Sequence, residues 1–303
     1  MTERSENSQK APSSITVVFS PYHVGLRDHR VGDGPNRIFQ LGVVQDLEQL
    51  GLQVHFKEID RVDDFEGEIG RSFEVLRRTS TAITEIRKAG SFPIVLSGNC
   101  MATVGVACGL DVEHPSFIYF DAHNDMDTPS TNTNGYLDAM GLSMLGGHSF
   151  HKLIATVPGY RPLKYDKFVF CGLRDIDEEQ RDTTKEAGPV VIWGDIETKV
   201  DYPAELAKIL DKSKYDSALV HLDLDVLDQS LGKVNGYESP GGMFEDEVMA
   251  CMDMVPQKAE PVSLTVCSFN PNLGDGDKIG VIGVRAIVTF AKSLLQTGAI
   301  RLP

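Results

Sequence analysis

Eight short apolar runs, most of them rich in Val, Ile and Phe, alternate along the chain with helix-length segments. Such runs are typical of strands that are buried on both faces, because a strand with one wet face alternates apolar and polar residues. Strands separated by helical segments pair in parallel, with helices on both faces of the sheet. We therefore predict a three-layer α/β/α sandwich with a mainly parallel sheet of about eight strands, at 15–19, 53–56, 92–96, 116–120, 167–171, 190–192, 218–222 and 262–267.

Helical patterns fill the intervals between these strands. No Pro/Gly/Ser-rich linker divides the chain, and no internal repeat is visible. We therefore expect a single domain over residues 14–303, preceded by a polar, disordered tail over residues 1–13. The predicted helices span 37–50, 70–88, 178–186, 203–210, 245–254 and 280–295.

Charge and composition exclude several classes of function. A net charge of −15 over 303 residues argues against a general binder of nucleic acid or anionic membranes. No segment approaches the roughly 18 uninterrupted apolar residues of a membrane-spanning helix, and the polar N-terminus lacks the apolar core of a secretory signal. The five cysteines show no CxxC spacing. These features indicate a reduced cytoplasmic protein, in which Cys108, Cys171 and Cys267 are expected to be small buried residues.

A metal-binding pattern follows the predicted strand 116–120. Asp121, His123 and Asp125 stand two residues apart directly after this apolar run. Side chains at this spacing can converge where a strand runs out into a loop. One imidazole between two carboxylates is a ligand set for a divalent first-row metal.

A second acidic pair ends the predicted strand 218–222. Asp223 and Asp225 follow this run at the same two-residue spacing. In a parallel sheet, ligands bind outside the carboxyl ends of the strands, so the two motifs are expected to meet at one edge. Together they predict a two-metal site.

The segments that carry these residues resemble the arginase/agmatinase (ureohydrolase) family. The resemblance runs in order from about residue 15 to about residue 295, with its most specific part in the paired DAHxD and DxDxxD motifs. The matching pieces are Gly32-Asp33-Gly34-Pro35, 96–100 (LSGNC), 120–125 (FDAHND), 172–175 (GLRD), 221–228 (HLDLDVLD) and Asn270-Pro271.

The resemblance implies two divalent metal ions, usually manganese, bridged by a hydroxide that attacks a guanidinium or amidino carbon. Carried over to this chain, the resemblance implies that both metals share the carboxylates of Asp121 and Asp223. Asp125 would hold the first metal, whereas His123 and Asp225 would hold the second. Because they would hold these metals, Asp125 and His123 are also expected to be catalytic residues. The family's members usually form trimers or hexamers, so a homo-oligomer is implied here too.

One departure from the family's pattern falls on a metal ligand. Cys100 stands where the family has a metal-binding His in a GGDH motif. If Cys100 ligates, its soft thiolate would shift the preference from manganese toward zinc, iron or nickel. Two other interpretations stay open: an inert buried thiol, which leaves the first metal site weak or empty, and a redox-active or nucleophilic thiol.

Other departures concern the substrate. Alignment on Asn270-Pro271 places Ser268 where arginine and agmatine hydrolases use a Glu to grip the guanidinium, and a hydroxyl cannot replace that charge. Glu238 lies in a loop that could reach the same cavity, and His23 could reach it from the loop after the first strand. Asp138 aligns with the family's proton-shuttling His, and a buried carboxyl of raised pKa could carry protons.

These features predict a divergent ureohydrolase-like enzyme. It would use metal-activated hydroxide to hydrolyse a C–N bond of a guanidino-, amidino- or amide-type small molecule, and Ser268 argues against ordinary arginase activity. Two alternatives remain open. One is a metal-dependent enzyme of another class, a dehydratase, cyclase or lyase; the other is a non-catalytic regulatory homologue.

Overall fold

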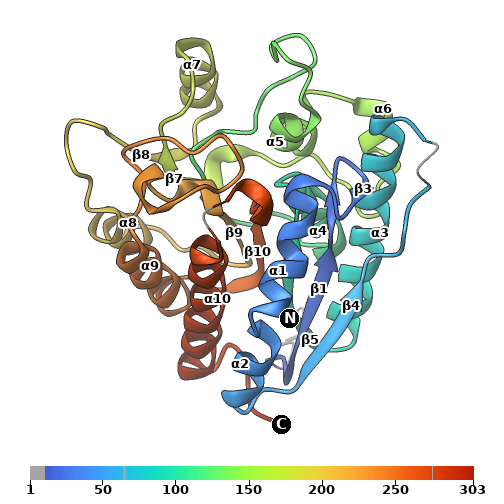
Figure 1. Cartoon of the computed structure of the whole chain (residues 1–303), viewed down its shortest axis with the longest axis vertical. Coiled ribbons are helices and arrows are strands. Elements are labelled where there is room, and N and C mark those ends of the chain that lie inside the picture. Colours follow the sequence, from blue (N-terminus) through green and yellow to red (C-terminus); the bar gives the residue numbers. More distant parts are fainter. Residues whose placement is uncertain (1–10, 64–65, 275) are drawn as a thin grey trace, which may run out of the picture.

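The computed structural model describes residues 11–63, 66–274 and 276–303. Eight strands form one parallel sheet in the order β4-β1-β5-β10-β9-β6-β7-β8 (Figure 1). This confirms the predicted α/β class and strand number. The strands are β1 (Ser14–Ser20), β4 (Val54–Glu58), β5 (Ser91–Ser97), β6 (Phe117–Phe120), β7 (Phe168–Leu173), β8 (Val190–Trp193), β9 (Ala218–Asp223) and β10 (Pro261–Cys267).

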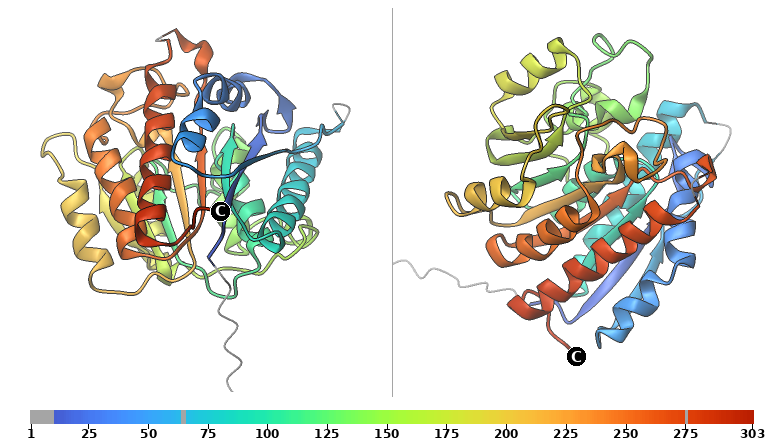
Figure 2. Two further views of the ribbon diagram at one scale, coloured as in Figure 1. Left: turned by 90° about the horizontal axis from the view of Figure 1, so that it is seen from below. Right: turned by 60° about the vertical axis from the view of Figure 1, so that its left-hand side comes forward.

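Helices cover both faces of the sheet (Figures 1 and 2). Alternate residues of each strand point to opposite faces, so the sheet has two separate apolar cores. On β6, for example, Ile118 and Phe120 join one core, and Phe117 and Tyr119 join the other. The first core packs α1 (Gly34–Gln40), α2 (Val43–Gln49), α8 (Tyr202–Leu210), α9 (Glu245–Lys258) and α10 (Lys278–Thr297); the second packs α3 (Glu68–Lys88), α4 (Ala102–Leu110), α5 (Gly141–Leu145) and α6 (His151–Ile154).

Two helix predictions need correction. The segment 37–50 is not one helix, because the backbone at Gly42 is left-handed (φ 93°) and separates α1 from α2. The sequence pattern also missed α4, whose residues are almost all buried and therefore show no polar face. Helix α7 (Glu178–Ala187) matches its predicted range closely and begins with an Asp177 capping box.

Helix α10 is long and apolar enough to cross a membrane by length and composition alone. However, 61% of its most apolar window is buried inside the protein, where it packs against α9. It is therefore a core helix.

The predicted disordered tail, residues 1–13, lies almost entirely outside the described residues.

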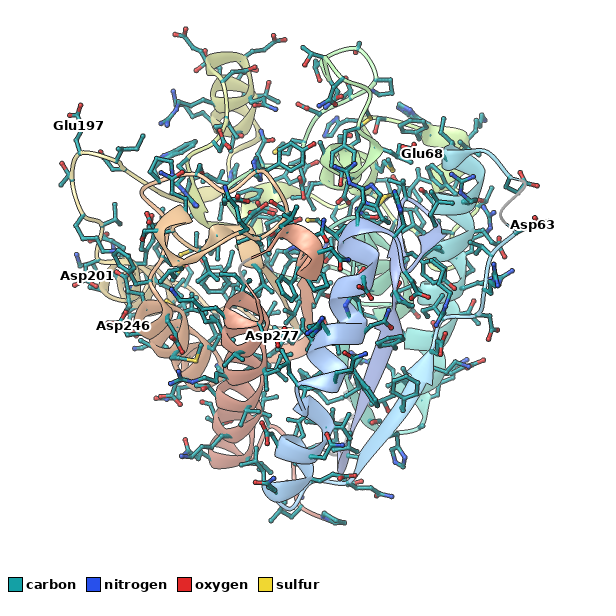
Figure 3. The ribbon with its side chains drawn as sticks, viewed as in Figure 1. Asp63, Glu68, Glu197, Asp201, Asp246 and Asp277 are labelled. Carbon is teal, nitrogen blue, oxygen red and sulfur yellow. The ribbon has the colours of Figure 1, made fainter. Side chains whose placement is uncertain are left out.

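The negative charge of the chain lies largely on its exposed surface. Figure 3 shows several of the acidic side chains that point into solvent around the ribbon. An acidic exterior disfavours association with polyanions. The labelled examples that are exposed are Asp63, Glu68, Glu197, Asp201 and Asp246.

Candidate metal centre

The candidate site lies at the carboxyl ends of five neighbouring strands, β1, β5, β10, β9 and β6. The loops that leave these strands pack closely. A Cβ atom on Gly98, after β5, would lie 2.2 Å from the carbonyl oxygen of Tyr22, after β1. Only glycine permits this approach. The loop that carries Cys100 is thereby held against the loop that carries His23.

The first group of potential ligands comprises Cys100, Asp121 and Asp125. Their ligand atoms all lie within 4.8 Å of one another, and all three side chains are buried. Asp125 has a left-handed backbone (φ 51°), which is costly for a residue other than glycine. Its Oδ2 accepts a 2.8 Å hydrogen bond from the Tyr119 hydroxyl, which fixes the carboxylate.

The second group comprises Asp121, His123 and Asp225, again within 4.8 Å of one another. His123 Nδ1 lies 3.4 Å from Asp121 Oδ1 and 3.3 Å from Asp225 Oδ2. Asn235 donates to Asp225 Oδ2 at 2.8 Å. Because Asp121 belongs to both groups, the two sets meet at its carboxylate.

Asp223 lies beside both groups, at the end of β9. The backbone amide of Asp225 donates to its Oδ1 at 2.7 Å. Its Oδ2 accepts hydrogen bonds from Cys100 Sγ and Ser268 Oγ, each at 2.5 Å. Asp223 therefore faces the thiol side of the cluster, and its predicted role as a ligand shared by two metals stays a prediction.

The electrostatics of this cluster fit bound cations. Burial, followed by the charge of Asp225, raises the pKa of Asp121 to about 7. Burial also raises the pKa of Asp125 and Asp223 well above the usual range. The carboxyl oxygen Asp121 Oδ2 is buried and has no hydrogen-bond partner among the described residues. Buried carboxylates without partners are costly, and divalent cations would compensate them.

In His123 and Asp225 the charged form is favoured instead. Burial, the largest single effect, opposes the charged form of each group. Their mutual attraction and the hydrogen bonds of their other neighbours together outweigh it, so the pKa of His123 is raised and that of Asp225 is lowered. In the absence of a cation, His123 therefore holds a proton between carboxylates. A cation bound to this imidazole would displace that proton.

A cavity of about 260 Å³ opens above the cluster. Tyr136 and Tyr237 stack with ring centroids 6.1 Å apart, and Tyr237 also meets the His123 ring edge-on at 6.3 Å. These aromatic rings form part of the cavity wall. The predicted site residues that line it are His23, Cys100, His123, Asp125, Asp138, Asp225 and Ser268.

Asp138 lines the cavity, but it also anchors the loop after β5. Its carboxylate accepts from Asn99 Nδ2 at 2.6 Å and from the backbone amides of Cys100 at 3.3 Å and Met101 at 2.8 Å. Burial raises its pKa to about 6 despite these donors. Its predicted proton transfer stays a prediction.

Glu238 is not among the described residues that line the cavity. Its carboxylate pairs with Lys233 at 2.8 Å and accepts from the backbone amide of Gly236 at 2.9 Å. These contacts stabilise its own loop. The predicted substrate contact of Glu238 stays a prediction that its position does not favour.

His23 lies between His29 and Tyr136, with ring centroids 5.7 and 5.9 Å away. It is buried at the cavity wall, and its Nδ1 has no hydrogen-bond partner among the described residues. Burial lowers its pKa to about 4, so it is neutral near pH 7.

The sequence reasoning missed two residues that face the cluster. His221 lies two residues before Asp223 on the same face of β9, and its ring stacks on Tyr119 with centroids 4.0 Å apart. The two-residue spacing could have identified His221. Cys267 is buried, as expected, but its Sγ also lies 3.8 Å from Cys100 Sγ. That approach depends on the spatial order of the strands, which no local pattern shows.

Most of the chain resembles known proteins. A family model described as "Arginase family" matches residues 14–293. An arginase from Brevibacillus brevis is 26% identical over 281 residues, which cover 86% of this chain and 91% of the relative. Among solved structures, arginase from Bacillus subtilis has a TM-score of 0.79 at 23% identity, covering 92% of this chain and 98% of that one. Proclavaminate amidino hydrolase from Streptomyces clavuligerus has a TM-score of 0.68 at 19% identity, with 95% of each chain covered.

Proposed function

The chain belongs to the arginase family, and we propose that it is a metal-dependent hydrolase of a C–N bond in a small cationic guanidino or amidino compound. Family membership supports a ureohydrolase-type hydrolase that acts on C–N bonds other than peptide bonds. The observation that carries the finer proposal is the buried cluster of Asp121, His123, Asp125 and Asp225 at the floor of a cavity. Without cations such a cluster would be a large cost in stability.

The residues that would hold the metal ions are the two groups that share Asp121, with Asp223 beside them. Two bound divalent cations would lower the pKa of a water molecule and stabilise negative charge at the reacting carbon. Manganese is the metal that the family resemblance implies. If Cys100 is a ligand of the first metal, its thiolate would instead favour zinc, iron or nickel.

The cavity wall favours a cationic, planar substrate group. Carboxylates outnumber permanent cations among the described lining residues, with Arg30 as the one guanidinium. A guanidinium or amidinium would be attracted by this charge and could stack on Tyr136 or Tyr237. Arg30 would suit a carboxylate elsewhere on the substrate.

Ser268 places a limit on the substrate. Its hydroxyl faces Asp223 and Cys100, with Oγ 2.5 Å from Asp223 Oδ2 and 2.9 Å from Cys100 Sγ. It therefore offers no charged fork for a guanidinium. We propose that the substrate is not free arginine, and that the carboxylates Asp127 and Asp177 of the wall bind its cationic end.

We propose that Asp138 transfers a proton during the hydrolysis. Its pKa of about 6 suits proton transfer near neutral pH.

We also propose a homo-oligomer of three or six chains in the cytoplasm, on the family resemblance alone. Light scattering coupled to size-exclusion chromatography would measure this state.

Product release tests the proposed reaction. The full chain, loaded with manganese or zinc, is incubated with a panel of guanidino, amidino and amide compounds, and urea, ammonia and amide products are measured. We expect release from at least one cationic guanidino or amidino compound and little from arginine. An Asp125→Asn variant should lose at least about a hundredfold of the rate, because it removes a ligand charge.

The exposed Asp246→Asn variant is the matched control, since Asp246 lies on α9 away from the cavity. Its rate should equal that of the unaltered chain. Bound metal without release from any compound of the panel would contradict hydrolysis and favour another reaction class. Absence of bound metal would favour a non-catalytic homologue.

A further inference from the structure

The loop after β1 gives one end of the cavity a positive charge. This loop contains the short strands β2 (Tyr22–His23) and β3 (Leu26–Arg27) and the 3₁₀ helix η1 (Arg30–Asp33). It brings His23 and Arg30 to the cavity wall, and we call these two residues the basic pole. The neighbouring Asp28 pairs with Arg27, so no ion pair within the described residues takes up the charge of Arg30.

The opposite end of the cavity is acidic. Asp127 lies in the loop after β6, and Asp177 lies at the start of α7, after β7; these two residues form the acidic pole. In the sheet, β5, β10, β9 and β6 separate β1 from β7. The two poles therefore lie on different sides of the rim, as β3 and α7 do in Figure 1. A carboxylate at the acidic pole would face two like charges.

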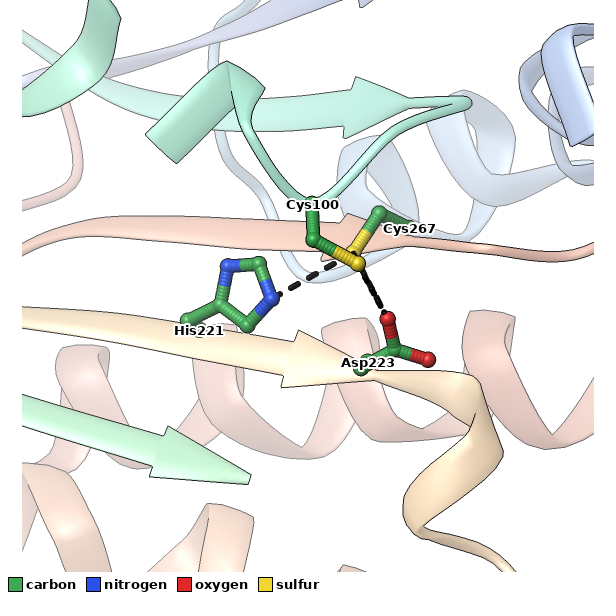
Figure 4. Close-up of side chains that lie close together, drawn as sticks. All are labelled: Cys100, His221, Asp223 and Cys267. Carbon is green, nitrogen blue, oxygen red and sulfur yellow. Dashed lines mark hydrogen bonds between the residues drawn. The ribbon is translucent and has the colours of Figure 1, made fainter. Parts of the chain in front are cut away.

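The described groups beneath the cavity do not supply a cation for a carboxylate either. Cys100 meets His221, Asp223 and Cys267 there (Figure 4). Burial lowers the pKa of His221 to about 3, so this imidazole is neutral near pH 7. Metal ions held by the cluster would be balanced by its own carboxylates. The loop after β1 is therefore the part of the wall that suits a carboxylate.

The backbone of this loop is held in a costly conformation. Val24, Asp28 and Arg30 are left-handed, with φ of 42°, 54° and 49°. Hydrogen bonds support the loop: the Val24 amide donates to Asn99 Oδ1 at 2.5 Å, and the Asp28 amide donates to the Pro21 carbonyl at 2.9 Å. An anchored loop presents its side chains in a defined direction, which favours recognition of a ligand.

His23 lies close to the guanidinium of Arg30. Its imidazole is buried beside Tyr136, and the structure gives its Nδ1 no hydrogen-bond partner among the residues that it describes. Burial, followed by the charge of Arg30, lowers the pKa of His23 to about 4. A neutral imidazole keeps one N–H donor. A carboxylate bound to Arg30 could accept a hydrogen bond from it.

We propose that Arg30 and His23 form a subsite for a carboxylate of the substrate. This inference rests on the proposed function: the substrate is then a guanidino or amidino acid other than free arginine, with its carboxylate at the loop after β1. The planar guanidinium of Arg30 matches a carboxylate through two parallel hydrogen bonds.

The cavity wall leads from this subsite to the metal cluster. From His23 through Tyr136 and Tyr237 to His123, successive ring centroids lie 5.9, 6.1 and 6.3 Å apart. These rings would flank the carbon chain of the substrate. The guanidino or amidino group then lies over the cluster, on the side of the acidic pole.

Binding to the metal-loaded full chain tests the subsite separately from turnover. The probes are guanidino acids of increasing chain length, each compared with the alkylguanidine of the same length that lacks the carboxylate. Calorimetry measures their affinities, and the Asp125→Asn variant replaces the unaltered chain for any probe that is hydrolysed. We expect at least one acid to bind about tenfold more tightly than its alkylguanidine, the usual effect of hydrogen bonds to a charged group.

Substitutions assign this preference to the subsite. Arg30→Gln should lose the preference for the acid, whereas Arg30→Lys should keep part of it, because the charge remains and the planar fork is lost. His23→Phe, which removes the N–H, should reduce the preference about fivefold. Arg285→Gln is the matched control: it changes the net charge equally, but Arg285 is exposed on α10 and pairs with Glu245.

The proposal is overturned if no acid binds more tightly than its alkylguanidine, or if Arg30→Gln keeps the preference shown by Arg285→Gln. Release of urea and ammonia is measured in the same panel. A preference that depends on Arg30, without any release, would support the subsite and reject the proposed reaction. Release from alkylguanidines as fast as from the acids would support the reaction and reject the subsite.

Discussion

Ser268 illustrates how one side chain changes the chemistry of this site. It has a left-handed backbone (φ 67°), an unfavourable conformation for a residue other than glycine. The strain brings its hydroxyl to Asp223 and Cys100. A residue at the cavity floor thus serves to position a carboxylate instead of presenting a charge to the substrate.

Removal of this hydroxyl should weaken metal binding. For Ser268→Ala we expect metal affinity to fall about 10- to 100-fold, the usual effect of losing a hydrogen bond to a ligand. Competition with a chelating dye measures the affinity. Ser263→Ala is the control, since Ser263 is buried on β10, the strand that Ser268 follows, and its hydroxyl has no hydrogen-bond partner among the described residues. Equal affinities in the two variants would contradict the positioning role.

His23 should make stability depend on pH. Burial lowers its pKa from 6.5 to about 4 in the folded chain, so protons bind the unfolded chain more readily between these values. The neutral imidazole therefore contributes full stability above pH 6.5, and this contribution is lost as the pH falls toward 4. The loss should reach about 3 kcal/mol, at about 1.4 kcal/mol per pH unit.

Urea unfolding at several pH values measures this loss. His23→Gln has no group that titrates in this range, so its stability should fall less than that of the unaltered chain between pH 6.5 and 4. The exposed His114→Gln is the control and should follow the unaltered chain. If His23→Gln and His114→Gln gave parallel curves, the buried imidazole would not be the cause.

At the scale of elements, the site depends on how the loops after the strands pack against each other. The loop after β5 approaches the loop after β1 at Gly98 and is anchored from the other side by Asp138, which accepts the amide of Met101 at the start of α4. Cys100 lies between these two fixed points. The position of the thiol is thereby set by backbone contacts on both sides.

A side chain at Gly98 should disturb this packing. In Gly98→Ala the new Cβ would meet the Tyr22 carbonyl at 2.2 Å, and the backbone must shift to accommodate it. We expect a loss of about 2 kcal/mol or more in the free energy of unfolding, together with weaker metal binding. Gly67→Ala is the control, because nothing lies within 4 Å of its Cβ position. A loss no larger than that of the control would contradict the close approach.

The sequence predicted the strands better than it predicted helix boundaries or the contacts between distant segments. All eight strands of the parallel sheet were identified, most of them because they are continuous apolar runs; the edge strand β4 contains polar residues as well. The break at Gly42 was missed because the flanking segments share one helical pattern, and α4 was missed because it has no polar face. The meeting of Cys267 with Asp223 depends on β10 lying next to β9, which is a property of the assembled sheet.

At the scale of the whole molecule, the fold concentrates buried charge at one edge of an otherwise apolar sheet. Asp121, Asp125, Asp223 and Asp225 are each at most 7% exposed, and four carboxylates so placed repel one another. The sheet imposes this arrangement because five strands end side by side. Bound cations would convert the repulsion into attraction, so metal binding and folding stability should be linked.

The most direct test for a metal centre is the metal content of the purified chain. After divalent metals are supplied and excess ions are removed, elemental mass spectrometry should find at least about one ion per chain. Removing the ions with a chelator should lower the melting temperature by about 5 °C or more, as expected for ligand at about 100 times its Kd. Less than about a tenth of an ion per chain, with an unchanged melting temperature, would contradict the proposal that the buried carboxylates form a metal centre.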